Sequence, residues 1–457
     1  MRYIRVGAGS AYWGDMLDPA VELAEKGNIQ YLGFDHLAEL TLAILQRMKR
    51  RDASKGYIPD IVPWMKALLP ITSQKGIKIL TNAGGANPVQ AGLEVIKVAR
   101  DLKLTGFKVG IVEGDDILHR LDDIRAQGWK FTNLDTGEED INSIHDRIVS
   151  ANVYIGADEL IRALEQGADV VVAGRCSDNA LYVAPIMHEF GWQFDHSAYV
   201  DKIAAAITVG HVVECTLGCT GGMSNLWPIV KDSYRIGFPI AEVYENGDAV
   251  ITKVEDSGGL VCEWTVKEHL LYEVHDPSNY IMPDGIADFT SLTIMEEAPN
   301  RVRIRGVKGK PRPDTLKVCI GYEDGFIGEG LIFFPWPQAL DKAKWAEKWL
   351  RERIEYMGVQ PQELRIDYVG INMLAGETAR WPENGNGMNE VGLRVVARTR
   401  TYQEADAIRR EVTHLWLAGP IGTSFGVPFT PRPVVALWPT LVPREMVKTT
   451  SFVMEVM

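Results

Sequence analysis

Cysteine is scarce in this chain of 457 residues, with five in total and no two of them spaced as Cys-x-x-Cys. That scarcity excludes a disulfide framework and argues against a structural zinc knot, so we expect reduced thiols in a cytoplasmic protein. Long apolar runs are missing too: no stretch of about 18 apolar residues occurs, which argues against a membrane-spanning helix. The N-terminus shows no basic segment followed by an apolar one, so we expect no secretory signal.

Basic residues are also fewer than acidic residues. The 48 lysines and arginines are outnumbered by 61 acidic residues, which gives a formal net charge of −13. This balance argues against nucleic acid and anionic membranes as partners, because both attract basic proteins. An anionic substrate would therefore require a local basic pocket. Hydrophobic residues make up 46% of the sequence, which is typical of a globular protein, and the length predicts two or three domains.

Short apolar runs alternate with helical segments over residues 3–190. We expect strands at 3–7, 31–34, 77–80, 108–112 and 169–173, and helices at 19–26, 38–50, 88–102, 158–166 and 179–190. Runs such as Val170-Val171-Val172 contain no polar residue, which is typical of strands covered by helices on both faces. The pattern predicts an α/β fold, with a doubly wound, mostly parallel sheet in a Rossmann-like domain at residues 1–237.

Residues 238–325 differ in character and are expected to form a β-rich insert or middle domain. An Asn246-Gly247 turn between two apolar runs predicts a hairpin, and Gly258-Gly259 before residues 260–266 predicts a further strand. The remaining elements follow the order strand, helix, strand, strand, helix, strand, and the first strand lies at 315–322 or at 331–334. This order predicts a C-terminal ferredoxin-like α+β domain at residues 326–457.

Four glycine-bearing loops, at residues 7–10, 82–87, 174–178 and 220–222, are the most informative feature. The first three follow apolar runs, and the carboxyl ends of parallel strands line one crevice, where glycine lets backbone N–H groups approach an anionic ligand. The alternative is that these loops only form turns and pack. The residues expected to bind a substrate are Gly9, Ser10, Trp13, Asp15, Asn82, Gly84, Gly85, Asn87, Cys176, Ser177, Thr220, Gly221 and Gly222.

The first loop also raises the question of a dinucleotide cofactor. Gly7 and Gly9 follow a strand, and Asp35 ends the next one, where an acidic group would bind a ribose hydroxyl. Tyr12 stands where the third glycine is required for close packing of helix on strand. We therefore expect no cofactor, and a nicotinamide-dependent oxidoreductase remains only an alternative.

The loop at 174–178 carries the densest set of functional groups. Arg175 can bind a carboxylate or phosphate and Asp178 can exchange protons, although a structural pair in which Asp178 also caps the next helix is the alternative. Residues 211–222 add Glu214 and Cys215, with His211 as a candidate base for the thiol. The Cys-x3-Cys spacing in this stretch does not match a zinc site, so we expect no metal. The predicted catalytic residues are Arg175, Asp178, Glu214 and Cys215.

Five motifs occur in a fixed order along the chain. They are Val6-Gly7-Ala8-Gly9-Ser10 with Trp13-Gly14-Asp15, Asn82-Ala83-Gly84-Gly85-Ala86-Asn87-Pro88, Gly174-Arg175 with Asp178, Glu214-Cys215 with Thr220-Gly221-Gly222, and Asp276-Pro277 with Tyr280, Pro283-Asp284 and Asp288-Phe289. Together they resemble the acyclic terpene utilisation protein A family. The resemblance implies a cytosolic bacterial protein tied to the breakdown of branched acids or their CoA thioesters. Because some relatives carry an additional small C-terminal domain, it also implies a separately encoded small subunit as a partner.

These observations lead us to expect a catabolic enzyme of the lyase or hydratase type. It would add or remove water or ammonia across a carbon–carbon double bond of a small carboxylic acid or acyl-CoA. Arg175 and loop N–H groups would bind a carboxylate or thioester oxygen, Asp178 or Glu214 would be the acid and base, and Ser10 and Asn82 would orient the other end. A non-catalytic acyl-CoA-binding or scaffold subunit is the second hypothesis, and in either case we expect a homo-oligomer.

Overall fold

The computed structural model describes residues 1–382, 387–426 and 429–457. The chain divides into two compact units: residues 1–321 together with 437–457 form the first, and residues 322–436 form the second. None of the helices in these described ranges is both long and apolar enough to cross a membrane.

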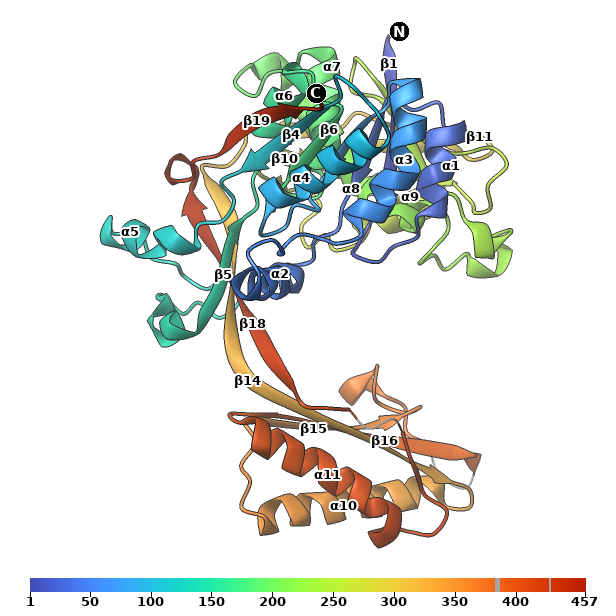
Figure 1. Cartoon of the computed structure of the whole chain (residues 1–457). Coiled ribbons are helices and arrows are strands. Elements are labelled where there is room, and N and C mark those ends of the chain that lie inside the picture. Colours follow the sequence, from blue (N-terminus) through green and yellow to red (C-terminus); the bar gives the residue numbers. More distant parts are fainter. Residues whose placement is uncertain (383–386, 427–428) are drawn as a thin grey trace. The chain divides into compact units, whose positions relative to one another are not determined.

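The first unit is built on one large mixed sheet (Figure 1). Its centre is parallel, because β1 pairs with β2, β2 with β3, β3 with β6 and β6 with β4 in the same direction. One edge continues antiparallel from β1 through β7, β8, β12 and β11, and β19 closes the other edge beside β4. The strands are β1 (Tyr3–Ser10), β2 (Tyr31–Phe34), β3 (Lys78–Thr81), β4 (Lys108–Glu113), β6 (Val170–Ala173), β7 (Pro239–Tyr244), β8 (Ala249–Lys253), β11 (Thr293–Ala298), β12 (Arg301–Arg305) and β19 (Thr450–Glu455).

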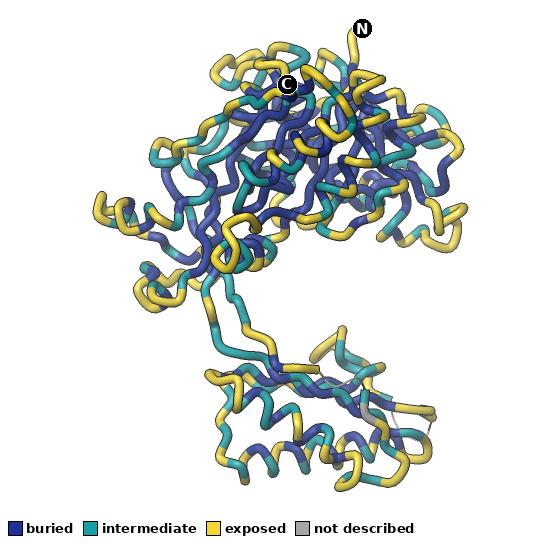
Figure 2. Tube along the Cα trace, in the orientation of Figure 1, coloured by how far each residue is buried: buried dark blue, intermediate teal, exposed yellow. Residues whose placement is uncertain are grey.

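Helices cover both faces of this sheet. One layer contains α1 (Asp18–Lys26), α3 (Ile61–Lys75) and α4 (Pro88–Asp101), and the other contains α6 (Asp158–Glu165), α7 (Ala180–Phe190) and α8 (Val200–Glu214). The run Val170-Val171-Val172 is fully buried between the layers, as its composition predicts. Figure 2 shows the buried residues concentrated along these strands. The mixed α/β class expected from the sequence is confirmed at this level.

A smaller three-stranded sheet packs on α8. It consists of β9 (Tyr280–Met282), β10 (Gly285–Asp288) and β13 (Lys308–Lys310). The hairpin expected around Asn246-Gly247 is present as β7 and β8, whereas residues 260–266, expected as a strand, lead into the helix α9 (Glu263–Leu271). The unit also contains α2 (Glu39–Arg51), α5 (Leu121–Ala126) and β5 (Ile148–Val153).

The second unit places two helices against one face of a sheet with the order β15-β16-β14-β17. Its complete elements are α10 (Ala339–Tyr356), β15 (Glu363–Val369), β16 (Glu390–Thr399), α11 (Tyr402–Ala418) and β17 (Ser424–Phe425). The strands β14 (Thr315–Pro335) and β18 (Arg432–Pro443) belong to both units, because β14 begins in the first unit and β18 ends in it. Both helices share one apolar core with the sheet, which includes Leu350 and Val412. The strands expected at 315–322 and 331–334 are parts of the single strand β14.

The domain boundary expected at residue 237 lies inside the first unit, and the one expected at residue 325 lies close to the start of the second. The strands β7, β8, β11 and β12 come from the segment expected as a separate insert, yet they extend the same sheet as β1. The contacts place the division between units at residues 321/322 and 436/437. The division into three domains stays a prediction. It does not follow the sheets, because strands from the expected insert belong to the large sheet of the first unit.

Candidate functional site

Polar side chains gather where three neighbouring parallel strands end. Ser10 lies at the end of β1, Asp35 and His36 follow β2, and Asn82 follows β3. The Ser10 hydroxyl donates to the Asp35 carbonyl over 2.7 Å, and the Asn82 amide donates to the Asp35 carboxylate over 2.5 Å and accepts the His36 N–H over 2.8 Å. All four residues are buried. The loops after β1, β2 and β3 are thus joined, as the strand order requires.

Oδ1 of the buried Asp35 carboxylate is occupied by the protein itself. Besides the Asn82 amide, it accepts the N–H of Leu37 over 3.1 Å, and the residue is 7% exposed. A ribose-binding carboxylate in a dinucleotide site must face the ligand. The arrangement gives no support to the nicotinamide alternative.

Close packing explains several of the expected glycines. A Cβ atom on Gly9 would lie 2.4 Å from the Phe34 ring, and a Cβ on Gly84 would lie 2.4 Å from the Ala173 carbonyl oxygen. The Asn87 amide donates to the carbonyls of Ala53 and Lys55 over 3.0 and 2.8 Å, and makes no capping bond to α4. These residues hold the loops against one another, and their role in ligand binding stays a prediction.

Arg175, at the end of β6, is the buried cation of the cluster and is 2% exposed. One guanidinium nitrogen lies 2.8 Å from the Asp178 carboxylate, the other terminal nitrogen donates to the Leu37 carbonyl, and Cζ lies 4.0 Å from the centre of the Tyr154 ring. Its backbone N–H donates to the Asp115 carboxylate over 2.9 Å. The structural pair named as an alternative therefore exists, but Asp178 does not cap α7.

Three aspartic acids around Arg175 hold their protons more strongly than usual. Burial, the largest cause in each case, raises the pKa of Asp35 to about 6 and the pKa values of Asp115 and Asp178 to about 7, although the Arg175 charge lowers those of Asp35 and Asp178. The Asp178 side chain keeps 34% of its surface exposed, so it is also within reach of a ligand. Carboxyl groups with such values exchange protons near neutral pH, which general acid and base catalysis requires.

A second group lies at the carboxyl end of α8. The Nδ1 atom of His211 is 3.2 Å from Oε1 of Glu214 and 3.1 Å from the hydroxyl of Tyr280, and its Nε2 atom is 3.1 Å from the Leu270 carbonyl oxygen. Asn179 donates to the Tyr280 hydroxyl over 3.3 Å, which links this group to the loop after β6. Burial lowers the pKa of His211 to about 4, and burial together with the Asp178 charge raises that of Glu214 well above its usual value.

The remaining expected residues lie in neighbouring loops with different surroundings. Asp15 accepts the N–H groups of Ala11 and Met16 over 2.8 and 2.7 Å, and burial raises its pKa. Trp13 is partly buried against the apolar core, and the Thr220 hydroxyl donates to the Leu217 carbonyl over 3.3 Å. Gly221 has a φ of +106°, which favours glycine, and Gly222 follows it in the same turn.

The cysteines are poorly placed to act as nucleophiles. Burial raises the pKa of Cys176, and burial with the Glu214 charge raises that of Cys215. The reactive form of cysteine is the thiolate, which these surroundings disfavour. Within the described ranges there is also no group of three or more His, Cys, Asp or Glu side chains that could hold a metal ion.

Unpaired polar atoms mark the centre of the cluster. Nine buried side-chain atoms of the described residues have no hydrogen-bond partner, and five of them belong to this cluster: Nε of Arg175, Oγ of Ser177, Oδ1 of Asp178, Oδ1 of Asn179 and Oε2 of Glu214. Oδ1 of Asp178 belongs to the ion pair with Arg175 but lies outside an aligned hydrogen bond. Buried polar atoms are nearly always paired, with protein, water or a ligand. Five of them in one loop and the adjoining helix end indicate a place that a polar ligand or water occupies.

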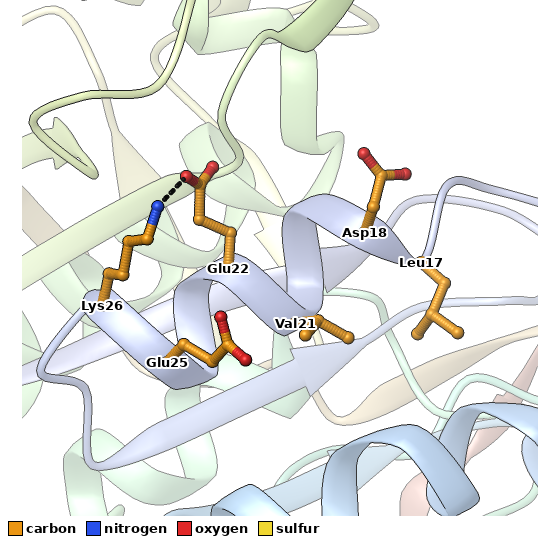
Figure 3. A pocket seen from close by; sticks show the side chains of 6 residues that line it. All are labelled: Leu17, Asp18, Val21, Glu22, Glu25 and Lys26. Carbon is orange, nitrogen blue, oxygen red and sulfur yellow. Dashed lines mark hydrogen bonds and ion pairs between the residues drawn. The ribbon is translucent and has the colours of Figure 1, made fainter.

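Two surface hollows of the first unit lie away from this cluster. One, of about 540 Å³, runs along α1, where Lys26 pairs with Glu22 over 3.0 Å and Asp18 and Glu25 add further carboxylates (Figure 3). The other, of about 350 Å³, lies at the amino ends of β3, β4 and β6, next to Asp169. Neither hollow is lined by a residue of the polar cluster. The candidate site is therefore identified by its unpaired polar atoms and its raised pKa values.

Sequence reasoning identified part of this cluster. Arg175, Asp178 and Glu214 were expected, and the structure brings Arg175 and Asp178 into direct contact. Asp115 and the partnership of Tyr280 with His211 were not expected. Asp115 could have been found from its position shortly after an apolar strand. Tyr280 belongs to one of the five motifs, but no role was predicted for it from the sequence.

One protein family matches almost the whole chain. The sequence matches the family described as acyclic terpene utilisation family protein AtuA over residues 4–453, which confirms the resemblance drawn from the five motifs. No curated protein and no solved structure gave a match.

Proposed function

We propose that this chain, which belongs to the acyclic terpene utilisation family AtuA, is a catabolic enzyme acting on a small carboxylic acid or acyl-CoA. The reaction we propose is of the lyase or hydratase type, with addition or elimination at a carbon–carbon double bond. The observation that carries the proposal is the set of five unpaired buried atoms beside carboxyl groups with raised pKa values. Perturbed titratable groups at a converging polar site are typical of active sites.

Elimination requires one group that removes a proton and another that protonates the leaving group. Asp178, with its pKa near 7, is present in both forms at neutral pH, and burial raises the pKa of Glu214 well above its usual value, which favours the neutral acid. Nε of Arg175 is an unpaired donor that can bind a carbonyl or thioester oxygen and stabilise the negative charge that forms on it. Ser177 and Asn179 supply further unpaired oxygen atoms for orienting the ligand.

A substrate screen tests this proposal. The protein is mixed with a panel of unsaturated acids and acyl-CoA thioesters, and loss or gain of the conjugated double bond is followed by ultraviolet absorbance. Asp178→Asn should lower kcat by about 100-fold or more, because general acid–base groups contribute about 10²- to 10⁴-fold. The exposed Asp123→Asn variant is the matched control and should retain wild-type kcat. Unchanged kcat in Asp178→Asn, or no turnover across the panel, would contradict the proposal.

The screen also separates the alternative. Binding of acyl-CoA without turnover would favour a non-catalytic acyl-CoA-binding or scaffold subunit. Cytoplasmic location and a homo-oligomeric state belong to the same proposal, and light scattering of the purified protein tests the second.

We also propose finer descriptions of the two units. The first is a doubly wound, Rossmann-like sheet, which is supported by its parallel centre and by helices on both faces. The second is ferredoxin-like, which is supported by the order β14-α10-β15-β16-α11-β18, by the pairing of β18 with β14 and by helices that share one core.

A further inference from the structure

The hydrogen bonds of His211 indicate where its proton lies. The Leu270 carbonyl oxygen, 3.1 Å from Nε2, can only accept a hydrogen bond. Nε2 therefore carries a hydrogen. A neutral ring then has a lone pair, and no hydrogen, on Nδ1.

Two oxygen atoms face that lone pair. The Tyr280 hydroxyl lies 3.1 Å from Nδ1, and Oε1 of Glu214 lies 3.2 Å from it. An ionised Glu214 would direct oxygen lone pairs at the nitrogen lone pair, which is repulsive. A protonated Oε1 instead donates a hydrogen bond to Nδ1. The competing arrangement, an imidazolium paired with a carboxylate, places two charges in a region where His211 and Glu214 are 2% and 8% exposed.

We propose that Glu214 works as an uncharged carboxylic acid that relays a proton between the ligand and His211, with Tyr280 as a second positioning residue. This inference rests on the function proposed above. In the step, the ligand gives a proton to Oε2 of Glu214 while Oε1 passes its own proton to Nδ1 of His211. The ligand becomes an anion, Glu214 stays neutral and His211 becomes an imidazolium, so charge and protons balance. The reverse step returns the proton.

The unpaired Oε2 atom is what makes Glu214 suitable for this role. It is buried and has no partner among the described residues, so it is the oxygen available to a ligand. The rings of Phe289 and His269 lie 5.8 and 5.9 Å from the His211 ring, and Tyr280 lies 4.7 Å away, so aromatic side chains surround the imidazole. Such packing keeps bulk water away from the relay.

Charged and titratable groups face the relay from each adjoining element. Burial opposes the imidazolium that the step forms, whereas the Glu273 and Asp178 charges favour it, and the Arg175 charge lowers the pKa of Glu214. Cys215 is adjacent to Glu214 in the chain, and its thiol is held neutral. These groups are Asp35 after β2, Arg175 and Asp178 after β6, Tyr182 on α7, Cys215 after α8, His269 and Glu273 in or after α9, and Tyr280 in β9.

Nitrogen NMR of the full-length protein, with its histidines labelled with ¹⁵N, tests the inference without a substrate. The His211→Gln variant assigns the signal. We expect a neutral His211 ring with hydrogen on Nε2 at pH 7, both in the wild type and in Glu214→Gln, because the glutamine amide donates to Nδ1 as the protonated acid does. Glu263→Gln on α9 is the control: Glu263 is half-buried and pairs with Lys267, and its change should leave the His211 signal unaltered. An imidazolium in the wild type that becomes neutral in Glu214→Gln would overturn the inference.

A kinetic experiment separates the relay from the enzyme proposal. With any substrate found in the screen, Glu214→Gln should lower kcat by at least 100-fold, and His211→Gln should lower kcat and change its pH profile while KM changes little. Wild-type kcat in Glu214→Gln would overturn the relay while turnover itself still supported the enzyme. A screen with no turnover would contradict the enzyme proposal and the relay step that rests on it, whereas the NMR experiment would still decide the protonation state of His211.

Discussion

The buried carboxyl group of Asp115 should make the stability of the first unit depend on pH. Asp115 is 3% exposed, and its carboxylate accepts the N–H of Arg175 and the side-chain amide of Asn152 over 2.9 and 2.8 Å. Burial nevertheless dominates, with a smaller contribution from the Asp116 charge, and raises the pKa from 3.8 to about 7. The folded state therefore holds this proton more tightly than the unfolded chain does.

The sign and size of the effect follow from proton linkage. Because the folded pKa lies above the unfolded value, the free energy of unfolding is unaffected by this group below about pH 4 and decreases as the pH rises to about 7. A difference of roughly three pKa units corresponds to about 4 kcal/mol in total. From pH 5 to pH 8 the expected loss is about 2–3 kcal/mol, since part of the decrease occurs below pH 5.

Asp115→Asn removes the titration and keeps the shape of the side chain. We expect the variant to be less stable than the wild type, or equal to it, at pH 5, because it changes two hydrogen bonds, each contributing about 1 kcal/mol. At pH 8 its stability relative to the wild type should be about 2–3 kcal/mol more favourable than at pH 5. Urea unfolding at both pH values measures this difference, with the exposed Asp123→Asn as the control. The same stability difference at both pH values would refute the reasoning.

Two packing predictions test the two units separately by thermal unfolding. Gly84→Ala should destabilise the first unit by about 1–3 kcal/mol, because the new Cβ would lie 2.4 Å from the Ala173 carbonyl oxygen. Leu350→Ala should destabilise the second by about 2–5 kcal/mol, because the side chain is fully buried. Gly387→Ala, with open space around its Cβ, and Leu374→Ala, at 98% exposure, should each stay within about 0.5 kcal/mol. Unfolding temperatures for the buried variants equal to those of these controls would contradict the packing described here.

Elements with local signals were predictable from the sequence. The turn at Asn246-Gly247 requires positive φ, which Gly247 adopts at +93°, and so the hairpin was found. The helix α9 was missed because Val261, Thr265 and Val266 favour a strand locally. Thr265 and Val266 are fully buried, so tertiary packing overrides that preference.

Long-range pairing was not predictable in the same way. The antiparallel pairing of β7 with β1 joins residues more than two hundred positions apart, and no local pattern specifies it. The helix α3 was missed for a different reason, since it contains Pro70, which normally argues against a helix interior.

The candidate site shows the same difference between local contacts, which the sequence predicts, and long-range contacts, which it does not. Arg175 and Asp178 are three residues apart, so their contact follows from the local chain, and the loops after neighbouring parallel strands meet because of the strand order. The contact between His211 and Tyr280 depends on the small sheet packing on α8, and 69 positions separate the two residues. The sequence therefore predicted Arg175 and Asp178 as site residues, but it gave no role for Tyr280.

Charge balance at the cluster limits which ligand group it accepts. Arg175 is the buried cation beside Asp35, Asp115 and Asp178, and Glu214 adds a further acid. Full ionisation would leave an excess of buried negative charge, and burial accordingly raises the pKa values of all four acids. A free carboxylate would add another negative charge next to Asp178, whereas the carbonyl of a thioester adds none and still accepts a hydrogen bond from Nε of Arg175. Within the proposed function, the electrostatics therefore favour an acyl thioester over a free acid as the group that enters the cluster.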